Sequence, residues 1–211
     1  MELKAFATQT QASNAAAEFV ATAIESALAT ASDVVIALSG GTTPQHFLEH
    51  LGGMDIPWQH IRVTLTDERQ VPADHAESNY RLLRETLFAG RVPESVFMAL
   101  TEENLAECAS LPLIPLLGMG TDGHFASIFA DAPQLSTLLD PSGDQWVAAV
   151  ATQASPYLRT TLTMKSLDRC KQAGLLVFGD TKRQLLADAD AFPVGRLLDQ
   201  LQQRLQVFWA P

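Results

Sequence analysis

Several features that would point to particular classes of protein are scarce or absent. The 211 residues include only two cysteines, Cys108 and Cys170, which form no C-x-x-C pair. Neither a disulfide framework nor a cysteine-based zinc site is therefore expected, and the pattern is typical of a reducing compartment, which we take to be the cytoplasm. No run of 18 apolar residues occurs, and residues 1–19 lack the basic and apolar regions of a signal peptide. We therefore predict no membrane-spanning helix and no secretory leader.

Basic residues are also scarce. The chain carries 14 Lys and Arg against 24 Asp and Glu, a formal net charge of -10. Binding to a phosphate backbone needs patches of Lys and Arg, so nucleic acid is not expected as a partner. A small anionic substrate is compatible with this charge, because two or three local cations are enough to hold one phosphate. The apolar content of 47% is that of a folded chain with a sizeable core.

Short apolar runs alternate with segments of helical periodicity. We expect helices at residues 13–30, in "TPQHFLEHL", where Thr43 would be the N-cap and Pro44 the first helical residue, and in "SNYRLLRETLF", which Ser78 would cap. Further helices are expected in "KSLDRCKQ", "TKRQLLADAD" and "GRLLDQLQQRL". Strands are expected in "DVVIALSGG", "IRVTLTDER", "LPLIPLLGMG", "WVAAVAT", "AGLLVFGD" and "QVFWA".

This alternation predicts a fold class. It favours an α/β protein with a mostly parallel, Rossmann-like sheet and helices on both faces, and we expect one domain over residues 1–211. In such sheets ligands bind beyond the carboxyl ends of the strands. Residues that directly follow the expected strands are therefore the candidates for a functional site.

Two candidate groups follow early strands. The first is the loop Ser39, Gly40, Gly41 and Thr42, whose glycines allow a tight turn and whose following helix offers free N–H groups to an anion. It lacks the G-K-[ST] ending of a Walker A loop, and taken alone it could be only a capped turn. The second group is "TDER", in which Asp67 and Arg69 directly follow a strand. Arg69 could pair with a phosphate or with Asp67.

The stretch "LLGMGTDGHFASIF" admits two interpretations. Gly118, Gly120 and Gly123 match G-x-G-x-x-G, the spacing of a dinucleotide-binding loop. That motif also needs a following helix and, after the next strand, an acidic residue, and neither is evident here. The alternative is a flexible turn that presents His124, an imidazole able to take a proton from water near neutral pH. We favour this second interpretation.

Two cations lie near strand or turn boundaries in the last third of the chain. Arg159 occurs in "LRTTLT" and Lys182 in "FGDTK". Each alone could be a surface cation. Together with Arg69 they could form a clamp for an anion in an otherwise acidic protein.

Taken in order, these stretches resemble the 6-phosphogluconolactonases, a family related to the glucosamine-6-phosphate isomerases/deaminases. The combination of D-E-R-x-V-P with S-N-Y, followed by G-M-G-x-D-G-H-x-A-S, carries the resemblance, which extends over about residues 36–183. It implies hydrolysis of 6-phospho-D-glucono-1,5-lactone to 6-phosphogluconate in the cytoplasmic pentose phosphate pathway, with no metal, no cofactor and no covalent intermediate. The chain would act as a monomer or a homodimer.

The resemblance also implies roles for individual residues. His124 would activate the hydrolytic water, Asp67 and Arg69 would contact the substrate, and the Ser39–Thr42 loop, Arg159 and Lys182 would hold the phosphate or the carbonyl. The chain departs from the family pattern at Phe125, Thr160 and Asp168, where threonine, isoleucine and asparagine are usual.

Two other functions are compatible with the same fold. A glucosamine-6-phosphate isomerase/deaminase would need an additional carboxylate five positions after the histidine, where this chain has Phe129. A non-catalytic sugar-phosphate-binding protein would keep the pocket without chemistry, but such sensors usually carry a DNA-binding or partner domain, of which we see no sign. Lactone hydrolysis is therefore the function that we predict.

Overall fold

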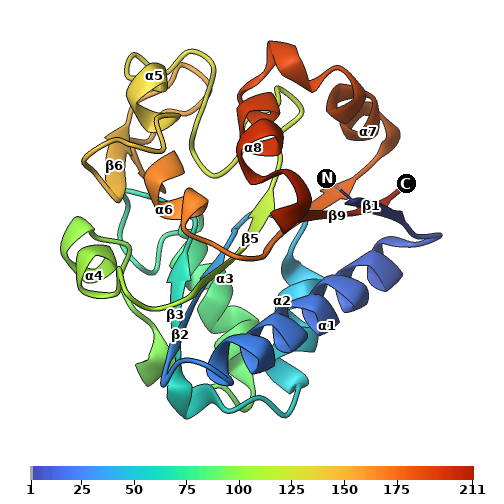
Figure 1. Cartoon of the computed structure of the whole chain (residues 1–211), viewed down its shortest axis with the longest axis vertical. Coiled ribbons are helices and arrows are strands. Elements are labelled where there is room, and N and C mark those ends of the chain that lie inside the picture. The colour runs from blue at the N-terminus through green and yellow to red at the C-terminus, as the bar shows by residue number, and fades with distance from the viewer. Residues whose placement is uncertain (1) are drawn as a thin grey trace.

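The protein is built around a six-stranded parallel sheet. The computed structural model describes residues 2–211, and its main sheet has the strand order β1-β9-β8-β5-β2-β3 (Figure 1). All neighbouring strands of this sheet run parallel. The strands are β1 (Glu2–Ala5), β2 (Val34–Leu38), β3 (Ile61–Leu65), β5 (Leu113–Gly118), β8 (Ala173–Phe178) and β9 (Leu205–Ala210). The predicted α/β class with a mostly parallel sheet is confirmed.

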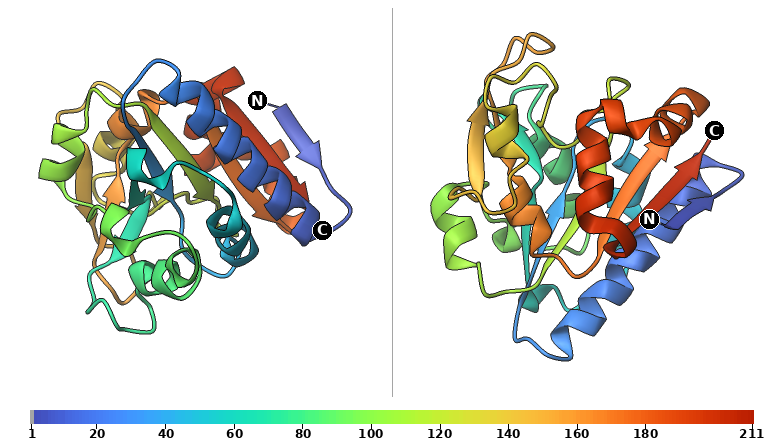
Figure 2. Two further views of the ribbon diagram at one scale, coloured as in Figure 1. Left: turned by 90° about the horizontal axis from the view of Figure 1, so that it is seen from below. Right: turned by 45° about the horizontal axis from the view of Figure 1, so that its top comes forward.

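Helices cover both faces of this sheet. The helix α1 lies on one face and α8 on the opposite face (Figure 2). The eight α-helices among residues 2–211 are α1 (Gln9–Leu28), α2 (Gln45–Gly53), α3 (Asn79–Glu85), α4 (Glu102–Glu107), α5 (Leu135–Leu138), α6 (Met164–Asp168), α7 (Asp180–Ala187) and α8 (Pro193–Leu201). Short 3-10 turns occupy Trp58–His60, Leu87–Ala89, Glu94–Val96, Ala189–Ala191 and Gln202–Arg204. No helix within residues 2–211 is long and apolar enough to span a bilayer.

The core forms where the apolar strands meet the apolar helix faces. Every residue of β2 is buried, as expected of a β-branched run with parallel neighbours on both sides. Phe47, Leu48 and Leu51 of α2 are fully buried, and α1 buries Ala16 and Val20 at helical spacing. Each large side chain removed from water in this way stabilises the fold by about 1.5–3 kcal/mol.

A second, smaller sheet was not predicted. It contains β4 (Asp67–Arg69), β7 (Arg159–Leu162) and β6 (Val147–Val150) in the order β4-β7-β6, and its strands are antiparallel. "IRVTLTDER", expected to be one strand, is thus two, because the chain leaves the main sheet at Thr66. The Thr66 N–H still donates to Leu38, whereas the Thr66 carbonyl accepts from Leu162. "WVAAVAT" is correctly a strand, but it belongs to this second sheet.

Two expected helix starts shift. The first helix starts at Gln9 rather than near residue 13, because the Thr8 side chain accepts a hydrogen bond from the Gln11 N–H and caps the helix. Pro44 occupies the N-cap of α2 instead of its first turn, so Thr43 is not the cap. Ser78 does cap α3, as predicted, by accepting from Arg81. Pro115 is tolerated within β5, whose pairing with β8 begins only at Leu116.

Candidate functional site

All the predicted site residues line one cavity at the carboxyl ends of β2 and β5. The cavity has a volume of about 220 Å³. Its lining includes each residue singled out from the sequence, namely Ser39, Gly40, Gly41, Thr42, Asp67, Arg69, His124, Arg159 and Lys182. These residues come from positions 39 to 182, so folding brings together segments far apart in the chain. Beyond strand ends is where an open α/β sheet binds its ligands.

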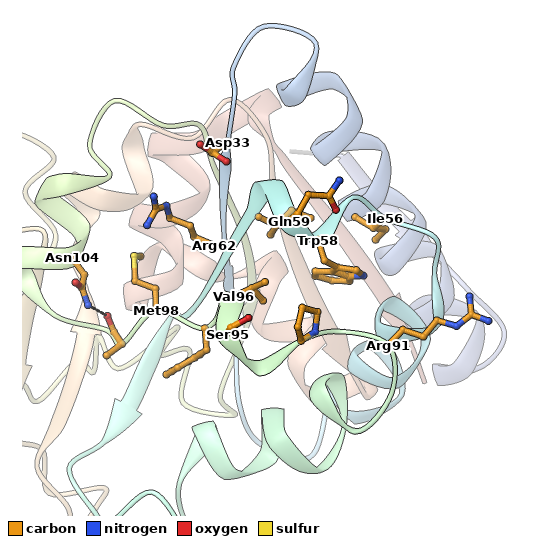
Figure 3. Close-up of a pocket in the computed structure, with 14 residues that line it drawn as sticks. Asp33, Ile56, Trp58, Gln59, Arg62, Arg91, Ser95, Val96, Met98 and Asn104 are labelled. Carbon is orange, nitrogen blue, oxygen red and sulfur yellow. Dashed lines mark hydrogen bonds between the residues drawn. The ribbon is translucent and has the colours of Figure 1, made fainter.

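A larger cavity lies at the opposite ends of the strands. It has a volume of about 770 Å³ and lies before β2 and β3, and Figure 3 shows Asp33 and Arg62 on one side of Trp58 and Arg91 on the other. Neither arginine is buried, and none of the predicted site residues lines this cavity. The smaller cavity is therefore our candidate active site, since it gathers the chemically competent side chains.

The glycine-rich stretch after β5 forms a tight loop and does not start a helix. The Gly120 N–H donates to the His124 carbonyl at 2.9 Å, and Gly123 adopts a φ of 74° that few other residues tolerate. The next helix, α5, begins only at Leu135. A dinucleotide-binding loop needs a helix directly after its glycines, so the structure favours the interpretation as a turn that presents His124.

Asp122 holds the His124 ring from within the same loop. The Asp122 Oδ1 lies 2.5 Å from Nδ1 of His124 and 3.3 Å from the His124 backbone nitrogen. The hydrogen bond from His124 lowers the pKa of the Asp122 carboxyl, against the opposing effect of burial, so this group is an anion near neutral pH. Because an ionised carboxylate only accepts, Nδ1 carries the proton and Nε2 is left as the basic nitrogen. Asp122 was not predicted as a site residue, although it stands two residues before His124 in the sequence.

Asp67 and Arg159 form a buried ion pair across β4 and β7. The Asp67 Oδ2 lies 3.4 Å from Nη1 of Arg159 and accepts a hydrogen bond of 2.6 Å from the Ser127 hydroxyl. The Asn79 amide donates to the Asp67 carbonyl at 2.8 Å. Burial lowers the pKa of Arg159 and the Asp67 charge opposes this shift, yet a guanidinium stays charged. Asp67 is thus placed to hold Arg159 at the cavity.

Asp67 and Arg69 share one face of β4, and Glu68 faces the other way because side chains alternate along a strand. The Glu68 carboxylate accepts hydrogen bonds of 2.8 Å from both the Asn79 and Tyr80 N–H groups at the start of α3. The Arg69 guanidinium donates to the Glu77 carbonyl at 2.6 Å. This arrangement fixes β4 to α3 through Glu68 and leaves Asp67 and Arg69 at the cavity.

The Ser39–Thr42 loop packs against Asn79. A Cβ at Gly40 would lie 1.9 Å from Oδ1 of Asn79, so only glycine allows this close approach. Gly41 has a φ of 89°, which also favours glycine. Asn79 is buried and lines the cavity. It was missed as a site residue, although it belongs to the S-N-Y motif that was recognised.

Lys182 approaches the cavity from the first turn of α7. Burial lowers the pKa of its ammonium group, and the negative charge of Asp122 opposes this shift. The Asp122 carboxylate is thus close enough to Lys182 to influence its charge.

The three departures from the family pattern lie outside the cavity lining. Phe125 is fully buried, Thr160 accepts a hydrogen bond from the Gln70 amide, and Asp168 pairs with Arg204 at 2.7 Å. Among residues 2–211 no group of three or more His, Cys, Asp and Glu side chains is placed to hold a metal ion.

The chain is similar to several known proteins over most of its length. The model of the family "Glucosamine-6-phosphate isomerases/6-phosphogluconolactonase" matches residues 7–204. A 6-phosphogluconolactonase of Caulobacter vibrioides is 37% identical over 226 residues, covering 100% of this chain and 97% of the relative. One from Pseudomonas aeruginosa is 36% identical and covers 95% of this chain and 91% of the relative. The crystal structure of a 6-phosphogluconolactonase from Shewanella baltica superposes with a TM-score of 0.91 at 27% identity, covering 100% of this chain and 98% of that one. The chain therefore belongs to the glucosamine-6-phosphate isomerase/6-phosphogluconolactonase family.

Proposed function

We propose that this protein hydrolyses 6-phospho-D-glucono-1,5-lactone to 6-phosphogluconate, a step of the pentose phosphate pathway. The observation that carries the proposal is the Asp122–His124 pair, a histidine base oriented by a carboxylate, in a cavity that also contains Arg69, Arg159 and Lys182. The names of the relatives support the same reaction. The whole chain would act as one domain, since the family match runs from residue 7 to residue 204.

In this mechanism His124 acts as a general base. Its free Nε2 takes a proton from water, and the hydroxide so formed attacks the lactone carbonyl carbon. The carbonyl oxygen becomes an oxyanion that the cations of the cavity or its backbone N–H groups stabilise. When the tetrahedral intermediate collapses, the bond from the carbonyl carbon to the ring oxygen breaks, and the imidazolium returns its proton to that oxygen.

A covalent intermediate is not required. Lactones are activated esters, so an activated water is a sufficient nucleophile. Ser127 is fully buried, does not line the cavity, and donates its hydroxyl proton to Asp67. Its oxygen is therefore not available for attack.

The phosphate of the substrate would be held by the Ser39–Thr42 loop and the cations. The loop precedes the N-terminus of α2, where free N–H groups favour an anion. Arg69, Arg159 and Lys182 add local positive charge to a protein whose net charge is -10. The size of the cavity, about 220 Å³, suits a small substrate rather than a polymer.

The alternative reactions fit the site less well. A glucosamine-6-phosphate isomerase/deaminase would need a carboxylate at the position of Phe129, whose ring cannot move a proton between carbons. A protein that only binds sugar phosphates would gain nothing from an imidazole held by a carboxylate. Hydrolysis uses both members of the Asp122–His124 pair.

The test is hydrolysis of freshly generated lactone, measured against its spontaneous opening in buffer. We expect wild-type acceleration and a loss of about 10²–10⁴-fold in kcat for His124→Ala, the usual contribution of a general base. His60→Ala, which removes an exposed histidine 3.7 Å from Asp33, is the matched control and should leave kcat unchanged. Circular dichroism would check that both variants fold. A wild-type rate equal to the buffer rate would refute the proposal, and ammonia release from glucosamine 6-phosphate would then be tested.

A further inference from the structure

The Phe129 ring contacts two residues of the candidate active site, His124 and Arg159. Its ring centroid lies 4.1 Å from that of the His124 imidazole, with 30° between the planes. The Arg159 guanidinium carbon lies over the same ring, 5.4 Å from its centroid. Phe129 itself is only 3% exposed and does not line the cavity. The ring therefore links the base to a cation without reaching the space that the substrate would fill.

The contact with His124 supplies a restraint that Asp122 does not. The hydrogen bond that His124 donates to Asp122 fixes one atom of the imidazole, Nδ1, and still lets the ring tilt about that contact. Packing of the Phe129 ring against the imidazole opposes this tilt. The His124 side chain remains 26% exposed, so the Phe129 contact leaves part of it open. Two contacts in different directions thus fix where Nε2 points, and a general base depends on that direction.

The contact with Arg159 adds an electrostatic effect. The face of an aromatic ring carries a negative potential and attracts cations. Arg159 is permanently charged, and His124 becomes charged each time it takes a proton from water. The Phe129 ring therefore favours the imidazolium over the neutral imidazole, in the same direction as the Asp122 carboxylate.

We infer that Phe129 is a positioning residue, which fixes the His124 imidazole relative to the Arg159 guanidinium and stabilises the imidazolium formed during turnover. The inference rests on the proposed function in its kinetic consequences. The contact between the Phe129 and His124 rings is independent of that function and can be tested without substrate. If Phe129 served only to fill the core, any apolar side chain of similar volume would replace it.

Substitutions at Phe129 distinguish a role in positioning His124 from a role in filling the core. Phe129→Leu and Phe129→Met retain apolar volume but remove the ring, whereas Phe129→Tyr retains the ring. Phe208→Leu is the matched control, since Phe208 is 1% exposed and packs against Phe19 at 5.4 Å between centroids, outside the cavity. Thermal unfolding of every variant measures the loss of core packing separately from the effect on the site.

In lactone hydrolysis we expect kcat of Phe129→Leu and Phe129→Met to fall about tenfold, through misdirection of Nε2 and loss of the ring face. KM should change much less than kcat, because Phe129 does not line the cavity that would hold the substrate. Phe129→Tyr should restore most of kcat. Phe208→Leu should leave kcat and KM unchanged even where its stability falls.

Nuclear magnetic resonance tests the same contact without substrate. The chain has five histidines, so His124→Gln would identify the His124 ring signals by their disappearance. An aromatic ring 4.1 Å away shifts these signals, so we expect their chemical shifts to change in Phe129→Leu and to stay near the wild-type values in Phe129→Tyr. A Phe129→Leu protein with wild-type kcat, or with unchanged His124 chemical shifts, would overturn the inference. If wild type fails to hydrolyse the lactone, the proposed function falls, and the chemical shifts alone still decide whether Phe129 positions the His124 ring.

Discussion

A single methyl group at Gly120 should abolish most of the activity while leaving the fold intact. A Cβ built at this position lies 2.3 Å from both Nδ1 and Cε1 of His124 and 2.4 Å from the Asp122 carboxylate. Ordinary contacts between such atoms are about 3.5 Å, so in Gly120→Ala the imidazole must move by about 1 Å. The hydrogen bond of 2.5 Å between Asp122 and His124 cannot survive this displacement. A misplacement of about 1 Å costs roughly 10²-fold in rate, and we expect that loss in kcat.

The stability of this variant should be almost unchanged. Gly120 does not have a positive φ, so its backbone accepts alanine, and the displaced ring is the partly exposed end of a side chain. Replacing glycine by alanine at a compatible site stabilises the fold by about 0.4–1 kcal/mol, because alanine leaves the unfolded chain fewer conformations. This gain offsets part of the strain caused by the new methyl group.

The assay compares lactone hydrolysis and thermal unfolding for Gly120→Ala and for the control Gly53→Ala, where a Cβ meets no atom within 4 Å. We expect the control to retain wild-type kcat. If Gly120→Ala hydrolyses the lactone at the wild-type rate, the contact between Asp122 and His124 is not needed for catalysis. If both variants lose activity equally, the loss does not come from displacement of the imidazole.

Three further predictions concern charge and capping. Burial lowers the pKa of Lys182 below its ordinary value of 10.5, so its ammonium group loses its charge at a lower pH than that of a solvated lysine. Titration calorimetry should therefore show that the binding of 6-phosphogluconate weakens as the pH rises toward 10.5. Lys182→Arg, which stays charged, should bind independently of pH there. Burial alone would raise the pKa of Asp168, but the hydrogen bonds from Arg204 and Gln200 outweigh burial, so the pKa lies below its ordinary value. The Asp168 charge therefore stabilises the fold above the unfolded-state pKa, and this stabilisation is lost as the pH falls through the folded-state pKa. Asp168→Asn should therefore lower the free energy of unfolding in urea by about 0.5 kcal/mol at pH 7 and by less in acid, since the pair is partly exposed. Glu68→Ala removes the acceptor at the start of α3 and should cost about 1–2 kcal/mol in the same assay, and an unchanged midpoint would contradict the capping role.

Five of the six strands of the main sheet could be predicted because their signals are local, whereas β1, with only four residues, was not predicted. The strand Val34–Leu38 is a continuous apolar run, and the helices on either side of it have clear periodicity and turns at their ends. The second sheet could not be predicted in this way. Its strands have only three or four residues, and β4 pairs with a strand about 90 positions away, as with Asp67 and Thr161. No local pattern encodes such a pairing.

The site residues also fall into those that the sequence could predict and those that it could not. His124, Arg69, Arg159 and Lys182 were identified because a histidine or a cation near the end of a strand or a turn suggests chemistry by its type and position. Asn79, Asp122 and Phe129 were missed as members of the site. An asparagine at the start of a helix, an aspartate in a turn and a phenylalanine in an apolar stretch all have ordinary structural uses. Only the distances to Gly40, His124 and Arg159 distinguish these three residues.

The order of strands in the main sheet has a consequence for synthesis of the chain. The strand β1 pairs only with β9, and β9 separates β1 from β8. During translation Glu2–Ala5 leaves the ribosome about 200 residues before its partner Leu205–Ala210. At a synthesis rate of about 5–20 residues per second, β1 waits tens of seconds without its native neighbour. The edge of the main sheet is thus completed only after its other strands have been made, and a nascent chain stalled before Leu205 would expose the unpaired side of β8.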